Sequence, residues 1–373
     1  MAEQGKIRKM FPGGNTTRGS YFMFENMIQP ATNRIFIIKG GPGVGKSTFI
    51  NSISREMIDR GYDVEHHHCS TDPDSLDGMV IPQLGVALLD GTSPHIFDPS
   101  CPGALDEIVN FGEYWDENIL KPHMEEVQEI NKRGSMHFKT AFHILKQSKM
   151  AYDQSKWYVE ESIDKPKYNR IQRFLVESVL EGMVPNYETA PKARHLFASA
   201  LTPKGIVDFK DTLISRDMKV YSIKGQPGTG VKEMIERVAK AAEEMGLYTE
   251  QYHCPFEPDR LDMLIITAAR IAVMNSTQPE HSTPKAMEGI SNISQVEEID
   301  LGICIKQDIL AMYKEERADA EKRYRDLLEK GISHIAEAKA AHGEREKFYY
   351  AAMNYEQVNE KRNQILGKIL QYT

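Results

Sequence analysis

Short apolar runs alternate with helical spacings of apolar residues along the N-terminal part of the chain. The run Ile35–Ile38 predicts a buried strand, and apolar residues at positions 49, 50, 53 and 57 share one face of a following helix. Tyr62–Cys69 and Gly85–Leu89 predict two further strands. Because strands that alternate with helices and are apolar on both faces are typical of parallel sheets, the pattern predicts an α/β fold.

The pattern changes between Ala104 and Glu181, where apolar residues recur at helical spacing and few glycines or prolines interrupt them. We predict two or three long helices there, broken near Gly134 and Pro166. Their apolar stripes are expected to pack between neighbouring helices; the alternative is a groove that binds a partner.

The turn after the first apolar run is rich in glycine. It consists of Gly40, Gly41, Pro42, Gly43, Val44, Gly45, Lys46, Ser47 and Thr48, which fit the phosphate-loop pattern G-x-x-x-x-G-K-[ST]. Glycines let such a loop wrap round a triphosphate, because they carry no Cβ and tolerate positive φ. We expect Lys46 to reach the β- and γ-phosphates and the Ser47 hydroxyl to ligate Mg²⁺.

A second glycine-rich stretch, KVYSIKGQPGTGVK at Lys219–Lys232, repeats the first. Gly225 lies 185 residues after Gly40 (225 − 40), and the same offset relates His68 to His253. Self-similarity over this length predicts a tandem duplication.

The duplication predicts two domains that pack together, each a P-loop parallel-sheet domain with an appended arm of long helices. The N-terminal unit is expected at 1–188 with its arm at about 104–182. The C-terminal unit is expected at 189–373 with its arm at about 300–371.

The second loop differs from the first at the positions that would bind phosphate and Mg²⁺. Val231 occupies the position of Lys46, Lys232 stands one residue late, and Asn275 replaces Asp90. The backbone of this loop, with Gly225, Gly228, Gly230 and Lys232, still predicts an anion-binding nest. We expect one competent site and one degenerate site with a structural or regulatory role.

An acidic residue ends the third predicted strand of the first unit. Asp90 follows the apolar stretch Val86–Leu89, the arrangement in which a carboxylate holds Mg²⁺ beside a phosphate loop. Gly91 stands where many fast ATPases place a water-activating Glu. His95 is a candidate to replace that base, and the alternative is an ordinary loop histidine.

The segment HHHCSTDPDSLD, residues His66–Asp77, is the second candidate for chemistry. Asp74 or Asp77 is expected to orient Mg²⁺, water or a phosphoryl acceptor, and Asp74 is our candidate catalytic residue. The alternative is that Asp74 caps a helix. A zinc site is disfavoured because no second His or Cys cluster completes the ligand set.

The motifs GGPGVGKST and LLDGTSPH resemble those of the P-loop NTPase superfamily. With HCSTDPDSLDG in one half and HCPFEPDRLD in the other, the chain resembles an uncharacterised bacterial family of two-P-loop predicted ATPases. The resemblance implies ATP binding and an α/β sheet, and it names no substrate. The loop is also similar to that of nucleotide kinases.

The composition of the chain restricts its expected location and partners. The chain has 373 residues, a net charge of −8 and four cysteines without a C-x-x-C pair, which favours a cytoplasmic protein with reduced thiols. Nucleic acid is not indicated as a partner, because no basic block occurs. No membrane association is expected, since no apolar run has the length of a span.

Three functions fit the sequence. The first is a Mg²⁺-dependent ATPase whose helical arms act on an unknown protein partner. The second is a nucleotide or small-molecule kinase with an unknown phosphoryl acceptor. The third is a nucleotide-sensing module with little turnover. Acceptor dependence distinguishes the first two.

Overall fold

The computed structural model describes residues 4–29, 31–187, 193–277 and 295–373. They form two compact units. Unit 1 consists of Met1–Gly14, Phe22–Ala141 and Ser333–Thr373, and unit 2 of Asn15–Tyr21 and Phe142–Ile332. Each unit therefore combines segments from both expected sequence repeats. The expected repeat boundary at 188/189 lies outside the described residues.

Unit 1 is built on a six-stranded sheet in the order β1-β5-β6-β7-β4-β8. In chain order its strands are β1 (Ile7–Met10), β4 (Arg34–Lys39), β5 (Val64–His68), β6 (Leu76–Ile81), β7 (Val86–Asp90) and β8 (Asp106–Asn110). The pairs β1/β5, β4/β7 and β4/β8 are parallel, whereas β6 runs antiparallel to β5 and to β7. The predicted α/β sheet with parallel strands is therefore confirmed in part, because β6 makes the sheet mixed.

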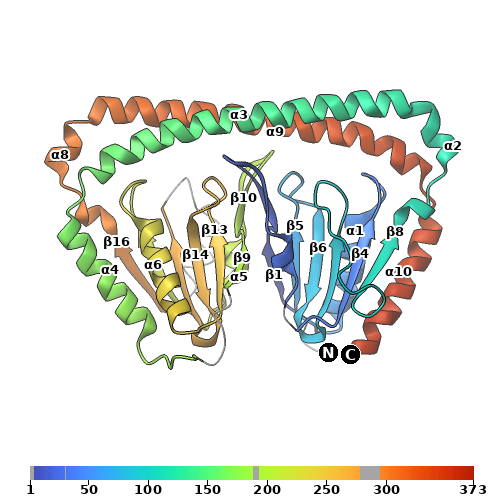
Figure 1. The fold of residues 1–373 in the computed structure, drawn as a ribbon, viewed down its shortest axis with the longest axis horizontal. Coiled ribbons are helices and arrows are strands. Elements are labelled where there is room, and N and C mark those ends of the chain that lie inside the picture. Colours follow the sequence, from blue (N-terminus) through green and yellow to red (C-terminus); the bar gives the residue numbers. More distant parts are fainter. Residues whose placement is uncertain (1–3, 30, 188–192, 278–294) are drawn as a thin grey trace. The chain divides into compact units, whose positions relative to one another are not determined.

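The helices of unit 1 come from both ends of the chain. They include α1 (Lys46–Asp59), the short α2 (Glu117–Leu120) and α10 (Tyr355–Ile369). The apolar face of α1 packs on the sheet, and α10 adds its buried residues Val358, Ile365 and Ile369 to the same core. Figure 1 shows α10, in red, beside α1 and the blue strands.

Unit 2 has a six-stranded sheet with a matching order, β9-β13-β14-β15-β12-β16. Its strands are β9 (Ala193–Leu196), β12 (Lys219–Lys224), β13 (Thr249–His253), β14 (Leu261–Ile266), β15 (Ile271–Asn275) and β16 (Gln295–Asp300). Here β14 is the antiparallel strand, between β13 and β15. A smaller sheet, ordered β11-β10-β2-β3, joins β2 (Gly13–Thr16), β3 (Gly19–Phe22), β10 (Ser199–Thr202) and β11 (Gly205–Asp208).

The helices of unit 2 repeat the arrangement of unit 1. They are α4 (Lys165–Leu180), α5 (Lys210–Leu213), α6 (Val231–Glu244) and α8 (Gln307–Ala311). Leu175 and Val179 of α4 join the core between α6 and the sheet. Figure 1 shows α4, in green, beside the yellow α6. Each six-stranded sheet is therefore covered by a helix that comes, in sequence, from the other expected repeat.

Two long helices, α3 (Met124–Glu160) and α9 (Lys314–Ala352), supply residues to both units. They run antiparallel: in unit 1 Arg133 pairs with Glu344, and in unit 2 the Ser148 hydroxyl donates to the Tyr324 carbonyl at 3.0 Å. The predicted break near Gly134 was wrong, since α3 continues through it. The one near Pro166 is confirmed, because α4 begins there with Asp164 as its N-cap.

Candidate functional site

The first glycine-rich loop connects the buried strand β4 to α1. Gly43 and Gly45 have φ of 69° and 89°, so both lie in the region that favours glycine. A Cβ on Gly40 would come within 2.9 Å of the Phe111 side chain. The backbone therefore requires glycine at these positions, as the phosphate-loop pattern predicts.

Three polar side chains converge at the start of α1. The Lys46 ammonium donates to the Gly41 carbonyl at 2.7 Å and lies 3.4 Å from the Asp90 carboxylate. The neighbouring Ser47 hydroxyl accepts the Leu76 N–H at 2.9 Å. Thus β7 brings Asp90 to the loop lysine, and β6 lies against the loop serine.

The structure also brings Asp77 to this place. Asp77 lies on β6 and is 8% exposed, and burial followed by the charge of Asp90 raises its pKa to about 8. Asp74, the residue favoured from sequence, is exposed, and its charge acts on His68. The helix-cap interpretation of Asp74 was wrong, because strand β6 and not a helix follows it.

His95 lies close to the same carboxylate. Its Nε2 is 3.9 Å from the Asp77 Oδ2, and its ring stacks on Phe24 with centroids 4.4 Å apart. Burial lowers the pKa of His95 to about 4, so the imidazole is neutral at pH 7. A neutral imidazole can accept a proton, which is the property that the candidate base needs.

Helices α9 and α10 contact the first loop, which the sequence did not predict. A Cβ on Gly41 would meet the Tyr349 ring at 2.7 Å, and the Tyr355 hydroxyl donates to the Gly43 carbonyl at 3.3 Å. The α9 residue Lys339 forms an ion pair of 2.5 Å with Asp72. The 185-residue offset relates Asp72 to Glu257. No sequence motif predicts the contacts of Tyr349, Tyr355 or Lys339 with the first loop and Asp72.

The second loop has a similar backbone with different side-chain chemistry. Gly228 and Gly230 have φ of 94° and 92°, and α6 begins at Val231. The Tyr168 hydroxyl of α4 donates to the Gly230 carbonyl at 2.9 Å. The cavity against this loop holds about 30 Å³, whereas small-molecule sites are typically about 300–1,000 Å³.

Lys232 of the second loop lies among buried partners. Its ammonium forms an ion pair with Glu257 and lies 3.2 Å from the Cys254 sulfur. At the end of β15, the Asn275 amide donates to Asp262 at 2.9 Å. An amide thus stands at the position of Asp90, and a lysine that is already paired stands at the position of Ser47.

The donor atoms at the first loop fit Mg²⁺, which prefers oxygen ligands such as the Ser47 hydroxyl and the Asp90 carboxylate. Across the described ranges, no group of three or more His, Cys, Asp or Glu side chains is arranged to hold a metal ion by itself. A magnesium ion at this place would therefore depend on phosphate and water oxygens as well.

Among the helices that the structure describes, none is both long enough and apolar enough to cross a membrane.

Comparison with known proteins identifies the family. Residues 23–245, more than half of the chain, match the KAP family P-loop domain. The matched range begins before β4, ends after α6, and so contains both glycine-rich loops. No curated protein and no solved structure matches the chain. A P-loop domain of this kind binds a nucleoside triphosphate through its loop. The chain belongs to the KAP family of P-loop domains.

Proposed function

We propose that the chain is a Mg²⁺-dependent ATPase with one competent site, at the loop Gly40–Thr48. The observation that carries the proposal is the convergence of Lys46, Ser47 and Asp90 at the start of α1. Lys46 would leave the Gly41 carbonyl and bind the β- and γ-phosphates. Ser47 and Asp90 would hold Mg²⁺, which neutralises charge on the phosphates.

The positions of Asp77, Asp74 and His95 relative to the first loop suggest their roles. Asp77 stands beside Asp90 and is available to orient water, whereas Asp74 is exposed. His95 keeps its proposed role as proton acceptor because its imidazole is neutral at pH 7. The proposed catalytic set is therefore Lys46, Asp90 and His95, with Asp77 in place of Asp74.

The second loop is proposed to be a degenerate copy that arose by tandem duplication. The support is the matching strand order of the two sheets and the 185-residue offset between the loops. The small cavity and the neutralised Lys232 argue that this copy serves structure or regulation. Four unbridged cysteines are consistent with a cytoplasmic location.

The test is ATP consumption with Mg²⁺, comparing the wild-type chain with Lys46→Ala. The matched control is Lys240→Ala, an exposed lysine on α6, the helix that follows the second loop. The proposal expects turnover without any acceptor, abolished in Lys46→Ala and unchanged in Lys240→Ala. If Lys46→Ala leaves turnover intact, the first loop is not the site of the reaction.

A kinase is the second candidate, and Gly91 favours it. A Cβ at Gly91 would lie 2.6 Å from the Ile37 side chain, so a glutamate directly after Asp90 has no room. A kinase needs no such base, because it activates its acceptor instead of water. Lys46-dependent turnover that begins only when pooled nucleotides and metabolites are added would establish the kinase.

The third candidate is a nucleotide-sensing module, supported by the Tyr355 contact with the loop carbonyl of Gly43. It would bind ATP tightly and release little phosphate with or without the pool. Its helical arms would pass the nucleotide state to a protein partner.

A further inference from the structure

A cavity of about 440 Å³ opens in unit 2, beside the segment that follows β13. Its volume lies within the range of about 300–1,000 Å³ that is typical of small-molecule sites. Five basic side chains line it, against two acidic ones: Arg18, Lys146, Lys149, Lys156 and Arg260, with Glu257 and Asp259. Neither the phosphate-loop motif nor the family match assigns a ligand to this place.

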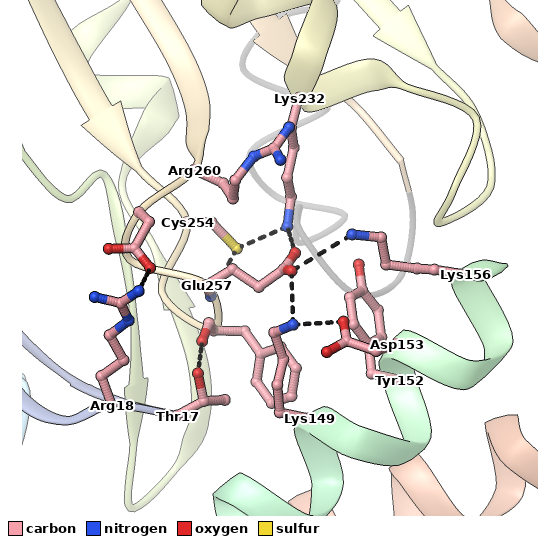
Figure 2. A network of polar contacts seen from close by, with 12 residues as sticks. Thr17, Arg18, Lys149, Tyr152, Asp153, Lys156, Lys232, Cys254, Glu257 and Arg260 are labelled. Carbon is pink, nitrogen blue, oxygen red and sulfur yellow. Dashed lines mark hydrogen bonds and ion pairs between the residues drawn. The ribbon is translucent and has the colours of Figure 1, made fainter. Parts of the chain in front are cut away.

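Glu257 is the centre of the charge network in this cavity, as Figure 2 shows. One carboxylate oxygen lies 3.2 Å from the Lys149 ammonium and 3.5 Å from that of Lys156. The other oxygen pairs with the buried Lys232. These lysines hold the pKa of Glu257 well below its usual value although burial opposes them, so the carboxylate remains ionised.

The lysines outnumber their acidic partners. Lys149 has a second ion pair, with Asp153, so Glu257 and Asp153 together face three lysines. Lys146 adds a fourth positive charge and has no ion pair or hydrogen bond within the described part of the chain. Two positive charges of the lysine group are therefore not neutralised by side chains that pair with it.

The two arginines do not add to this surplus. Arg18 pairs with Asp259 at 2.5 Å, and Arg260 pairs with Glu233 and Glu236 at 2.6 and 2.8 Å. The surplus therefore lies along α3, where Lys146, Lys149 and Lys156 line the cavity. At a rise of about 1.5 Å per residue, the first and last of them lie about 15 Å apart along the helix. The positive charge is thus distributed along one wall of a cavity of about 440 Å³, which suits a ligand with more than one anionic group.

We propose that this cavity binds a small ligand that carries two or more phosphoryl groups, held by Lys146, Lys149 and Lys156. Lysine ammonium groups bind phosphate as point charges and need no fixed orientation of the oxygens. The phosphoryl groups can belong to a nucleotide or to an inorganic polyphosphate. The site is separate from the first P-loop, and the proposal does not depend on the ATPase activity.

The test measures binding of inorganic tripolyphosphate to the full chain by isothermal titration calorimetry, at low salt and with EDTA. It uses the Lys46→Ala background, which removes the lysine of the first P-loop as a competing anion site. We compare that protein with two further variants, Lys146→Gln and Lys139→Gln. Both replace an exposed lysine of α3, but only Lys146 lines the cavity.

Tripolyphosphate is expected to bind the Lys46→Ala protein. Lys146→Gln is expected to weaken the affinity about tenfold, since it removes one charge-assisted contact, and Lys139→Gln to leave it unchanged. Because Lys146 has no partner to lose, a folding defect would not explain the difference. Absence of binding in the Lys46→Ala background, or equal effects of the two glutamine variants, would overturn the proposal.

A second arm uses ATP in place of tripolyphosphate under the same conditions. Tighter binding of ATP identifies a nucleotide as the ligand, and equal or weaker binding identifies the phosphoryl chain alone. Because the measurement is made without Mg²⁺ and without Lys46, its outcome is independent of whether the first loop hydrolyses ATP.

Discussion

The ion pair of Lys232 and Glu257 allows us to predict how much each partner contributes to the free energy of unfolding. The side chains are 8% and 6% exposed, so each charge depends on its partner for stabilisation. In Glu257→Gln, Lys232 loses its only carboxylate ion-pair partner within the described residues. The nearby Cys254 does not replace it, because burial raises the thiol pKa and keeps the sulfur neutral. Leaving a buried charge unpaired costs about 3–5 kcal/mol of the free energy of unfolding.

Substitution of the other partner, Lys232, is expected to lower the free energy of unfolding by less. In Lys232→Met the carboxylate of Glu257 keeps Lys149 and Lys156, at 3.2 and 3.5 Å, and methionine preserves most of the apolar stem. Only one charged hydrogen bond is lost, which corresponds to about 1.5–3 kcal/mol. The structure therefore predicts that Glu257→Gln destabilises unit 2 more than Lys232→Met does, by about 2 kcal/mol from the centres of the two ranges.

The assay is urea unfolding followed by tryptophan fluorescence. The chain has two tryptophans, Trp115 in unit 1 and Trp157 in unit 2, so a Trp115→Phe background reports on unit 2 alone. Equal costs, or a larger cost for Lys232→Met, would refute the reasoning that Lys149 and Lys156 stabilise Glu257.

The pH dependence gives an independent check on the same pair. The pKa of Glu257 is lowered on folding, so its contribution to stability is present above the unfolded pKa, near 4.5, and is lost as pH falls below it. The penalty of Glu257→Gln should therefore be full at pH 7 and should shrink at pH 4 and below. A penalty that does not change with pH would contradict the assignment of the charge.

Three further predictions concern the two loops and the first sheet. Burial lowers the pKa of His66 to about 3, so the wild type should lose up to about 1.4 kcal/mol per pH unit relative to His66→Gln as pH falls below 6.5, measured by acid unfolding. The pair Val231→Lys with Lys232→Ser restores the loop motif, but equilibrium dialysis should still find no added nucleotide site, because the cavity there is about 30 Å³. Gly91→Glu should lower thermal stability by about 1–3 kcal/mol and gain no turnover, since its Cβ meets Ile37.

The sequence predicted the parts of the site that local chemistry determines. The loop glycines and Lys46 follow from what a phosphate needs, and Asp90 follows from an apolar strand that ends in a carboxylate. Both expectations concern residues close to one another in the chain or attached to neighbouring strands. The structure brings these residues together as predicted, while their roles in binding stay proposals.

Strand β6 shows why part of the fold was missed. Its sequence, LDGMVI, begins with a leucine followed by Asp77 and Gly78, and both of the latter residue types are depleted in strands. Local propensity therefore favoured a turn and a helix cap. Tertiary packing decides otherwise, because a Cβ at Gly78 would meet the Met27 side chain at 2.3 Å and the Leu88 carbonyl at 2.8 Å. Because a turn and a helix cap were expected in place of β6, the burial of Asp77 was not predicted.

The exchange of helices between the two expected repeats could not be predicted from periodicity. The spacing of Leu175 and Val179, or of Val358 and Ile365, identifies an apolar face but does not identify the sheet that covers it. Because α4 and α10 follow long helices, each can reach a sheet distant in sequence. Contacts such as Tyr355 with the first loop then arise from packing, without a local signal.

The two loops show how one backbone can support different electrostatics. In unit 1 the α9 residue Lys339 pairs with Asp72, and in unit 2 the α3 residue Lys149 pairs with Glu257 at the matching position (339 − 149 = 190; 257 − 72 = 185). The longer Glu257 side chain also pairs with Lys232, the residue at the position of Ser47. A buried lysine thus stands at the position of Ser47, the residue that we propose to be a Mg²⁺ ligand in the first loop. In our proposal Mg²⁺ would bring positive charge to the first loop, and in the second loop the Lys232 ammonium already places positive charge at the matching position.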